Sequence, residues 1–175
     1  FHKIRPFLMI AIVGIALGLG ISYWLKPVWI SFEPTDKAFR ASFAEHSPVS
    51  MSMPKPQKYT FAKDDLLKVY SSRTPRGLDE INRLDEFTSA QADVDWFDAT
   101  VRETKARLIT GNAGDFSLEL AEGMFLRGRV FFSPDGKGLY KVFVIRGTSE
   151  DLESPSVVRF LYGVDFPKND PVSGA

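Results

Sequence analysis

The chain has 175 residues, and its 22 lysines and arginines equal its 22 aspartates and glutamates. This neutral balance lacks the basic excess of a dedicated nucleic-acid-binding protein, and a hydrophobic fraction of 44% excludes a wholly disordered chain. The absence of cysteine excludes disulfides, thiolate metal sites and cysteine nucleophiles. We therefore expect one globular domain with an appendage, and no nucleic acid among its partners.

An uncharged segment near the start predicts a transmembrane helix. From Phe7 to Leu25 there are 19 consecutive residues without a charge. At about 1.5 Å rise per residue they would span roughly 28 Å, which matches the hydrocarbon core of a bilayer. The apolar region of a cleaved signal peptide is shorter, about 7 to 15 residues, so we expect an uncleaved anchor.

The residues that flank this segment are typical of a membrane boundary. Lys3 and Arg5 precede it, and the aromatic residues Tyr23, Trp24 and Trp29 occur where lipid headgroups are expected. Lysine and arginine also follow the segment, so the count of positive residues does not decide its orientation.

Small residues within the segment predict a face for packing against another helix. Gly14 and Gly18 form a G-x-x-x-G pair, and Ala16 and Gly20 repeat the spacing on a neighbouring face. Such residues let two helix backbones approach closely, although glycine is also common in transmembrane helices. We interpret the pattern as a contact with an integral membrane subunit of a larger complex, within the lipid bilayer.

The chain divides after this segment. Residues 1–31 hold the N-terminal segment and the predicted transmembrane helix, and a short link, 32–37, leads to an extramembrane domain over 38–166 and a loose tail over 167–175. All 22 acidic residues follow Ser31, against 19 of the basic ones, so this part carries a net charge of about −3. We expect a mildly acidic domain close to the membrane surface.

Hydrophobic alternation predicts strands in the first half of the domain. We expect a hairpin from Ala38–Phe43 and Val49–Met53, because apolar and polar residues alternate on either side of a proline-containing turn. Tyr59–Ala62 and Leu66–Ser71 predict two further short strands. The segment Arg73–Arg83 is polar and predicts irregular structure.

The second half predicts a long helix, then strands, then a short helix. Thr88–Leu108 carries an apolar stripe through Trp96 and acidic early turns that suit the helix dipole. Gly128 indicates a bulge or a close backbone approach within a strand. Ser154 and Pro155 suit the N-cap and the first position of a closing helix. Three antiparallel strands are expected between the helices, at Asp115–Leu120, Met124–Phe132 and Leu139–Ile145, with a turn at Ser133–Gly138.

Six segments carry a pattern of structural residues: Ala38–Phe43, Gly111–Leu120, Arg127–Phe132, Leu139–Val142, Glu153–Ser156 and Arg159–Leu161. In this order they resemble a family of bacterial exported or membrane-anchored domains with a fold like PsbP, the extrinsic protein of photosystem II. The resemblance covers roughly Phe32 to Phe166, departs from the usual pattern at Ala44-Glu45, and has no counterpart for Arg73–Glu86. It implies an antiparallel sheet with packed helices on the periplasmic or lumenal side, hence a cytoplasmic N-terminus, in proteins that assist larger membrane complexes. No catalytic residue carries over.

These patterns together predict an α+β protein in which a single N-terminal transmembrane helix precedes an antiparallel β-sheet domain with one long and one short packing helix. We predict no catalytic, cofactor-binding or metal-ligating residue. His46 lies in an expected exposed turn, and no serine has the surroundings of a nucleophile elbow. Asp98 stands where a calcium-binding loop needs glycine.

The expected function is that of a non-catalytic accessory subunit of a bacterial inner-membrane complex, with its domain on the periplasmic face. A respiratory host and a photosynthetic one, such as a reaction centre with its antenna, stay open. The alternatives are an independent membrane-tethered periplasmic binding module and an assembly factor.

Four arginines are expected to form either one basic patch or a solvated face: Arg127, Arg129, Arg146 and Arg159.

Overall fold

The computed structural model describes residues 28–54, 66–86, 91–111 and 114–167. These residues form mostly β-strands, with two α-helices and two short 3-10 helices. In chain order the elements are β1 (Trp29–Phe32), β2 (Ala41–Ala44), β3 (Val49–Pro54), β4 (Leu66–Thr74), β5 (Gly77–Asp85), α2 (Ala92–Thr104), β6 (Arg107–Gly111), β7 (Asp115–Glu119), η1 (Ala121–Gly123), β8 (Phe125–Phe132), β9 (Gly138–Arg146), η2 (Glu150–Glu153) and α3 (Pro155–Tyr162).

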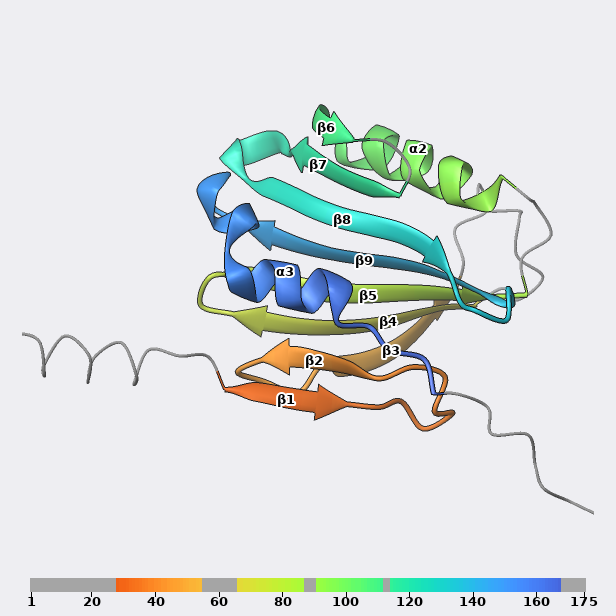
Figure 1. Ribbon diagram of the computed structural model, residues 1–175. Coiled ribbons are helices and arrows are strands. Elements are labelled where there is room, and N and C mark those ends of the chain that lie inside the picture. The colour runs from red at the N-terminus through yellow and green to blue at the C-terminus, as the bar shows by residue number, and fades with distance from the viewer. Residues whose placement is uncertain (1–27, 55–65, 87–90, 112–113, 168–175) are drawn as a thin grey trace, which may run out of the picture.

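Seven strands form one antiparallel sheet in the order β3-β4-β5-β9-β8-β7-β6 (Figure 1). Its centre is the pair β5–β9, which is in register from Gly77 opposite Arg146 to Asp85 opposite Gly138. The strands β1 and β2 form a separate antiparallel pair. Within the described residues, β3 and β6 are therefore the two edges of the large sheet.

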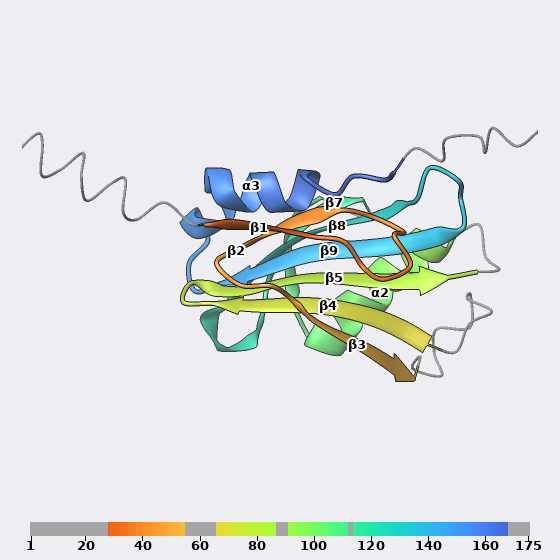
Figure 2. The same ribbon diagram turned by 90° about the horizontal axis from the view of Figure 1, so that it is seen from below.

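Both faces of the large sheet are covered. Figure 2 shows α3 and the β1–β2 pair on one face and α2 on the other. The core under α2 is built around Trp96, Leu118 and Leu139, and the core under α3 and β1–β2 around Phe43 and Phe160. The domain thus has three layers, with β9 buried between the outer two.

The closing helix forms as its sequence predicts. The Ser154 side chain accepts a hydrogen bond from the backbone N–H of Val157, and Pro155 occupies the first turn, where no N–H is needed. Phe160 and Leu161 on one side of α3 are buried against the sheet. The predicted N-cap and first position of this helix are confirmed.

The predicted membrane anchor and the location that follows from it need correction. The predicted span, Phe7–Leu25, lies outside the described residues, and none of the helices within them is long and apolar enough to cross a membrane. The longer of the two α-helices, α2, has 13 residues. The prediction of a single-pass inner-membrane protein with a periplasmic domain is therefore not supported and is withdrawn.

The predicted fold class is also wrong in its balance of helix and strand. The predicted long helix, Thr88–Leu108, ends at Thr104, because Lys105 adopts a left-handed conformation (φ 50°) that closes the last turn. The following residues, Arg107–Gly111, form the edge strand β6. The described chain is thus mainly two antiparallel sheets with two short helices, and not an α+β domain with a long helix.

Two predictions in the first half of the domain are corrected as well. The segments Ala38–Phe43 and Val49–Met53 do not pair with each other, since β2 pairs with β1 and β3 pairs with β4. Arg73–Arg83, predicted to be irregular, contains the tight β4–β5 turn and most of β5. Tyr59–Ala62 lies outside the described residues, whereas the strand predicted at Leu66–Ser71 is confirmed as β4.

Gly128 makes the close approach that its place in a strand indicated. It lies opposite Phe143 on β9 and Phe116 on β7. A Cβ atom there would lie 2.8 Å from Cζ of Phe116 and 3.0 Å from Cβ of Phe143. The missing side chain lets the Phe116 ring lie over β8, beneath α2.

We expect Gly128→Ala to destabilise the domain by about 1 to 3 kcal/mol, because the added methyl group overpacks the core. Gly147→Ala is the matched control, since nothing lies within 4 Å of a Cβ at that position. Urea unfolding of both variants checks this. Equal stabilities would contradict the close packing around Gly128.

Candidate docking surface

Most of the residues predicted to lie in or at the membrane are outside the described part of the chain. This holds for Gly14, Ala16, Gly18, Gly20, Tyr23 and Trp24. Trp29 is described, and it lies half-buried in β1. The guanidinium carbon of Arg159, on α3, lies 4.3 Å from the centroid of its ring, a distance typical of a cation–π contact.

Two of the four arginines predicted as a patch or a solvated face instead link the C-terminal helices to the sheet. The Arg127 guanidinium donates to the Glu153 carboxylate at 2.8 Å, and Arg129 donates to Asp115 at 2.7 Å. Arg129 also lies over the ring of Tyr162, 4.1 Å from its centroid. Because each of these arginines has its own partner, they do not form a free basic patch.

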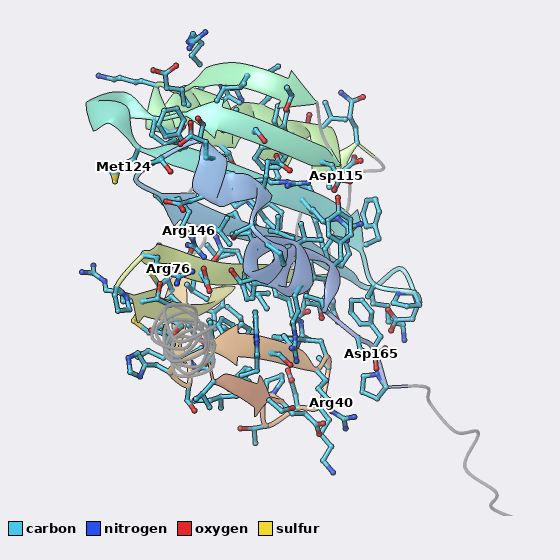
Figure 3. All side chains as sticks on the ribbon, turned by 60° about the vertical axis from the view of Figure 1, so that its left-hand side comes forward. Arg40, Arg76, Asp115, Met124, Arg146 and Asp165 are labelled. Atoms are coloured by element: carbon cyan, nitrogen blue, oxygen red, sulfur yellow. The ribbon has the colours of Figure 1, made fainter. Side chains whose placement is uncertain are left out.

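Arg146 forms a buried ion pair at the end of β9. It donates from Nη2 to Asp79 Oδ1 at 2.5 Å, and the two side chains are 6% and 2% exposed. Burial raises the pKa of Asp79, against the opposing effect of the Arg146 charge. Figure 3 shows Arg146 near Arg76, with which it lines a small hollow at this end of the sheet. The pair links β5 to β9.

We expect Arg146→Met to destabilise the domain by about 3 to 5 kcal/mol, because it leaves the Asp79 carboxylate buried without its cation. Arg107→Met removes an ion pair with Glu119 from an arginine that is 76% exposed, and should cost less than about 1 kcal/mol. Chemical unfolding of the two variants gives the comparison. Similar losses in both would contradict a special role for the buried pair.

A polar cleft of about 490 Å³ lies beside the β8–β9 turn. On its wall, Arg83 donates to Asp36 at 2.8 Å and to Asp85 at 2.5 Å, and Lys68 donates to Asp85 at 2.7 Å. Burial raises the pKa of Asp36, but the Arg83 charge, together with hydrogen bonds, outweighs it and lowers the pKa below the usual value. These charges neutralise one another and join β4 and β5 to the segment after β1.

A second stabilising contact closes this side of the domain. The backbones of Arg40 and Asp165 exchange two hydrogen bonds, at 2.7 and 2.8 Å, which tie the segment before β2 to the chain after α3 (Figure 3). Behind it, the rings of Phe39, Tyr70 and Tyr140 meet edge to face. The face under α3 is thus closed by paired charges, backbone bonds and aromatic contacts.

The outer edge of β3 is the most open apolar surface of a strand in the described residues. Val49, Met51 and Met53 point to the α2 side of the sheet and are 62%, 46% and 39% exposed. Ser50 and Ser52 occupy the opposite side, so the strand carries no charge. In an antiparallel pair, half of the edge-strand backbone groups point away from the neighbour, and here they face outward.

The other edge differs in the features that protect edge strands. β6 contains a register shift between Leu108 and Thr110, and Arg107 and Glu119 form an ion pair at its end. Bulges and charged side chains are devices by which proteins discourage edge-to-edge pairing. β3 has neither device over its regular pairing with β4, and proline, which also protects edges, stands only at its last position, Pro54. We therefore take β3 as the candidate docking surface.

Comparison with family models, with curated proteins and with solved structures finds nothing that matches this chain. The resemblance to PsbP-like domains accordingly stays a prediction. The sequence had identified the alternation in Val49–Met53, but not that its apolar side would be left exposed at an edge. The sequence feature that could have indicated this exposed edge is the absence of charge over the whole strand.

Proposed function

We propose that this domain is a non-catalytic accessory protein that binds another protein through the outer edge of β3. The observation that carries the proposal is an uncharged, regularly paired edge strand with three exposed apolar side chains on one side. Exposed strand edges accept an additional strand through main-chain hydrogen bonds, and side-chain pockets then provide specificity. In this view the domain is a subunit of a larger assembly.

The side chains of β3 define the chemistry of the partner. Val49, Met51 and Met53 would meet apolar residues at alternate positions of an extended segment, while Ser50 and Ser52 would meet small polar ones. Methionine is flexible and polarisable, so it adapts to irregular apolar partners. An extended segment of another chain, largely uncharged and alternating, therefore fits this edge best.

The test is co-purification of the full chain, tagged at its C-terminus and carrying Met51→Glu. A carboxylate at the centre of the apolar stripe would have to be buried without a partner on binding, so we expect at least tenfold less partner to be retained. Ile109→Glu is the matched control, because it places the same charge at an exposed apolar position of the opposite edge strand.

The proposal requires a stoichiometric partner that Met51→Glu loses and Ile109→Glu keeps. Both variants should unfold within about 0.5 kcal/mol of the natural chain, since both positions are at the surface. Equal retention by the two variants would contradict docking at β3. A concentration-dependent homodimer that Met51→Glu abolishes would replace the foreign partner with a second copy of the chain.

A further inference from the structure

A lysine is buried on the opposite side of the sheet from α3. Lys141 lies at the middle of β9 and is 8% exposed, between Leu139 and Phe143 on the face that α2 covers. Lysine is rarely buried unless it is paired, because taking an ammonium group out of water is costly. Its contacts therefore indicate what the site is built to hold.

The ammonium group has few partners. Its Nζ donates to the hydroxyl of Thr100 on α2 at 2.9 Å, and that hydroxyl donates in turn to the Trp96 carbonyl. Nζ also lies 5.0 Å from the centroid of the Trp96 ring and 5.6 Å from that of Phe143. Among the described residues, no carboxylate lies within the 4 Å that defines an ion pair with Nζ. Since an ammonium group has three donors, two remain for another acceptor.

A second buried polar group in this region also has an unused hydrogen-bonding atom. Asn82, on β5, lies directly opposite Lys141 and is 6% exposed. Its Oδ1 accepts no hydrogen bond in the structure. The buried region beneath α2 therefore contains more hydrogen-bonding capacity than its own residues use.

A cavity of about 190 Å³ adjoins the lysine, beneath the C-terminal half of α2. The walls are apolar, and Thr100 and Lys141 are its inner polar groups. Glu103 and Thr104 line it on the helix side. The apolar lining consists of Leu78, Phe116, Leu120, Leu126, Phe143 and Ile145.

Lys141 is the one positive charge among the described residues that line this cavity, and two carboxylates, Glu80 and Glu103, lie around it. Burial lowers the pKa of Lys141 to about 8, and Glu80 on β5 opposes this shift. The pKa of Glu80 is itself raised by burial, and Glu103 on α2 is exposed. At pH 7 the amine thus stays mostly protonated. Glu80 acts on it only from beyond contact distance, so a ligand carboxylate would supply a counter-charge in direct contact with Nζ.

We propose that this cavity binds a small apolar monocarboxylate, with its carboxylate accepting from Lys141 Nζ and its hydrocarbon tail among Phe116, Leu126 and Ile145. A dry cavity of 150 Å³ is large enough for benzene, so this one suits a chain of about six carbons or a single aromatic ring. Charge-assisted hydrogen bonds to the carboxylate would fix its orientation.

The first test compares three probes of nearly equal shape: hexanoate, 1-hexanol and hexylamine. Calorimetry and NMR titration of the full chain at pH 7 should show hexanoate binding at least tenfold tighter than hexanol, and no binding of protonated hexylamine. The shifts should centre on the methyl groups of Leu126 and Ile145. Equal affinity for hexanoate and hexanol, or no hexanoate binding at millimolar concentration, would overturn the proposal.

Lys141→Met provides the matched variant, since it shortens the unbranched side chain by only one atom and removes its charge. We expect hexanoate affinity to fall at least tenfold, to the level of hexanol, and hexanol affinity to stay the same. Replacing a buried charge with an apolar group of similar volume often preserves stability. If Lys141→Met binds hexanoate as well as the natural chain does, Lys141 is not the anion's partner.

The pH dependence gives a readout that cavity shape alone would not produce. Carboxylic acids ionise at about pH 4 to 5, so hexanoate is charged throughout the useful range. Between pH 6 and 7 the amine is protonated, whereas above about pH 8 it is neutral in the free protein. Hexanoate affinity should therefore fall by about tenfold per pH unit above pH 8. A flat profile in the natural chain would contradict the pairing.

Discussion

The pairing of β5 with β9 is the interaction on which the rest of the domain depends. It joins two antiparallel units, β3-β4-β5 and β9-β8-β7-β6, that are separated in the sequence by α2. Bringing two such distant segments together costs loop-closure entropy before any contact compensates for it. Burial on both faces of β9 provides that compensation, and the pair between Asp79 and Arg146 links the two strands at one end.

Because the β5–β9 pair joins distant segments, sequence patterns predicted local structure better than they predicted strand pairing. The cap at Ser154, the apolar stripe through Trp96 and the turn before Gly138 depend on neighbouring residues, and each forms as expected. The β5 strand was missed because two of its inward positions are charged. Asp79 and Arg83 interrupt the alternation. Asp79 pairs with the distant Arg146, and Arg83 pairs with the distant Asp36 as well as with its neighbour Asp85. A charge that is neutralised by a distant residue looks like a solvated one in the sequence alone.

The β3 edge and the Lys141 site could be predicted from the sequence only in part, because both depend on contacts between distant segments. The alternation of Val49, Met51 and Met53 identified a strand, but only the strand order reveals that its outer edge is unpaired within the described residues. Lys141 interrupts the apolar run from Leu139 to Ile145. A lysine within a strand that is buried on both faces has to be covered by the next layer, which here is α2. That single charge was a signal of a buried polar site.

The two faces of the sheet therefore differ in what they leave available for binding. Under α3, arginines pair with acids and rings pack against one another, so side chains of the domain itself satisfy the charged groups. On the α2 side, Met51 is exposed beyond the helix, and Lys141 and Asn82 retain unused hydrogen-bonding capacity beneath it. Buried polar groups with unused hydrogen-bonding atoms cost free energy of folding, and exposed apolar stripes are typical of contact surfaces. Both features are therefore more consistent with a binding role than with a purely structural one. The recognition surfaces of this domain are thus expected on its α2 side, around a scaffold that the α3 side holds closed.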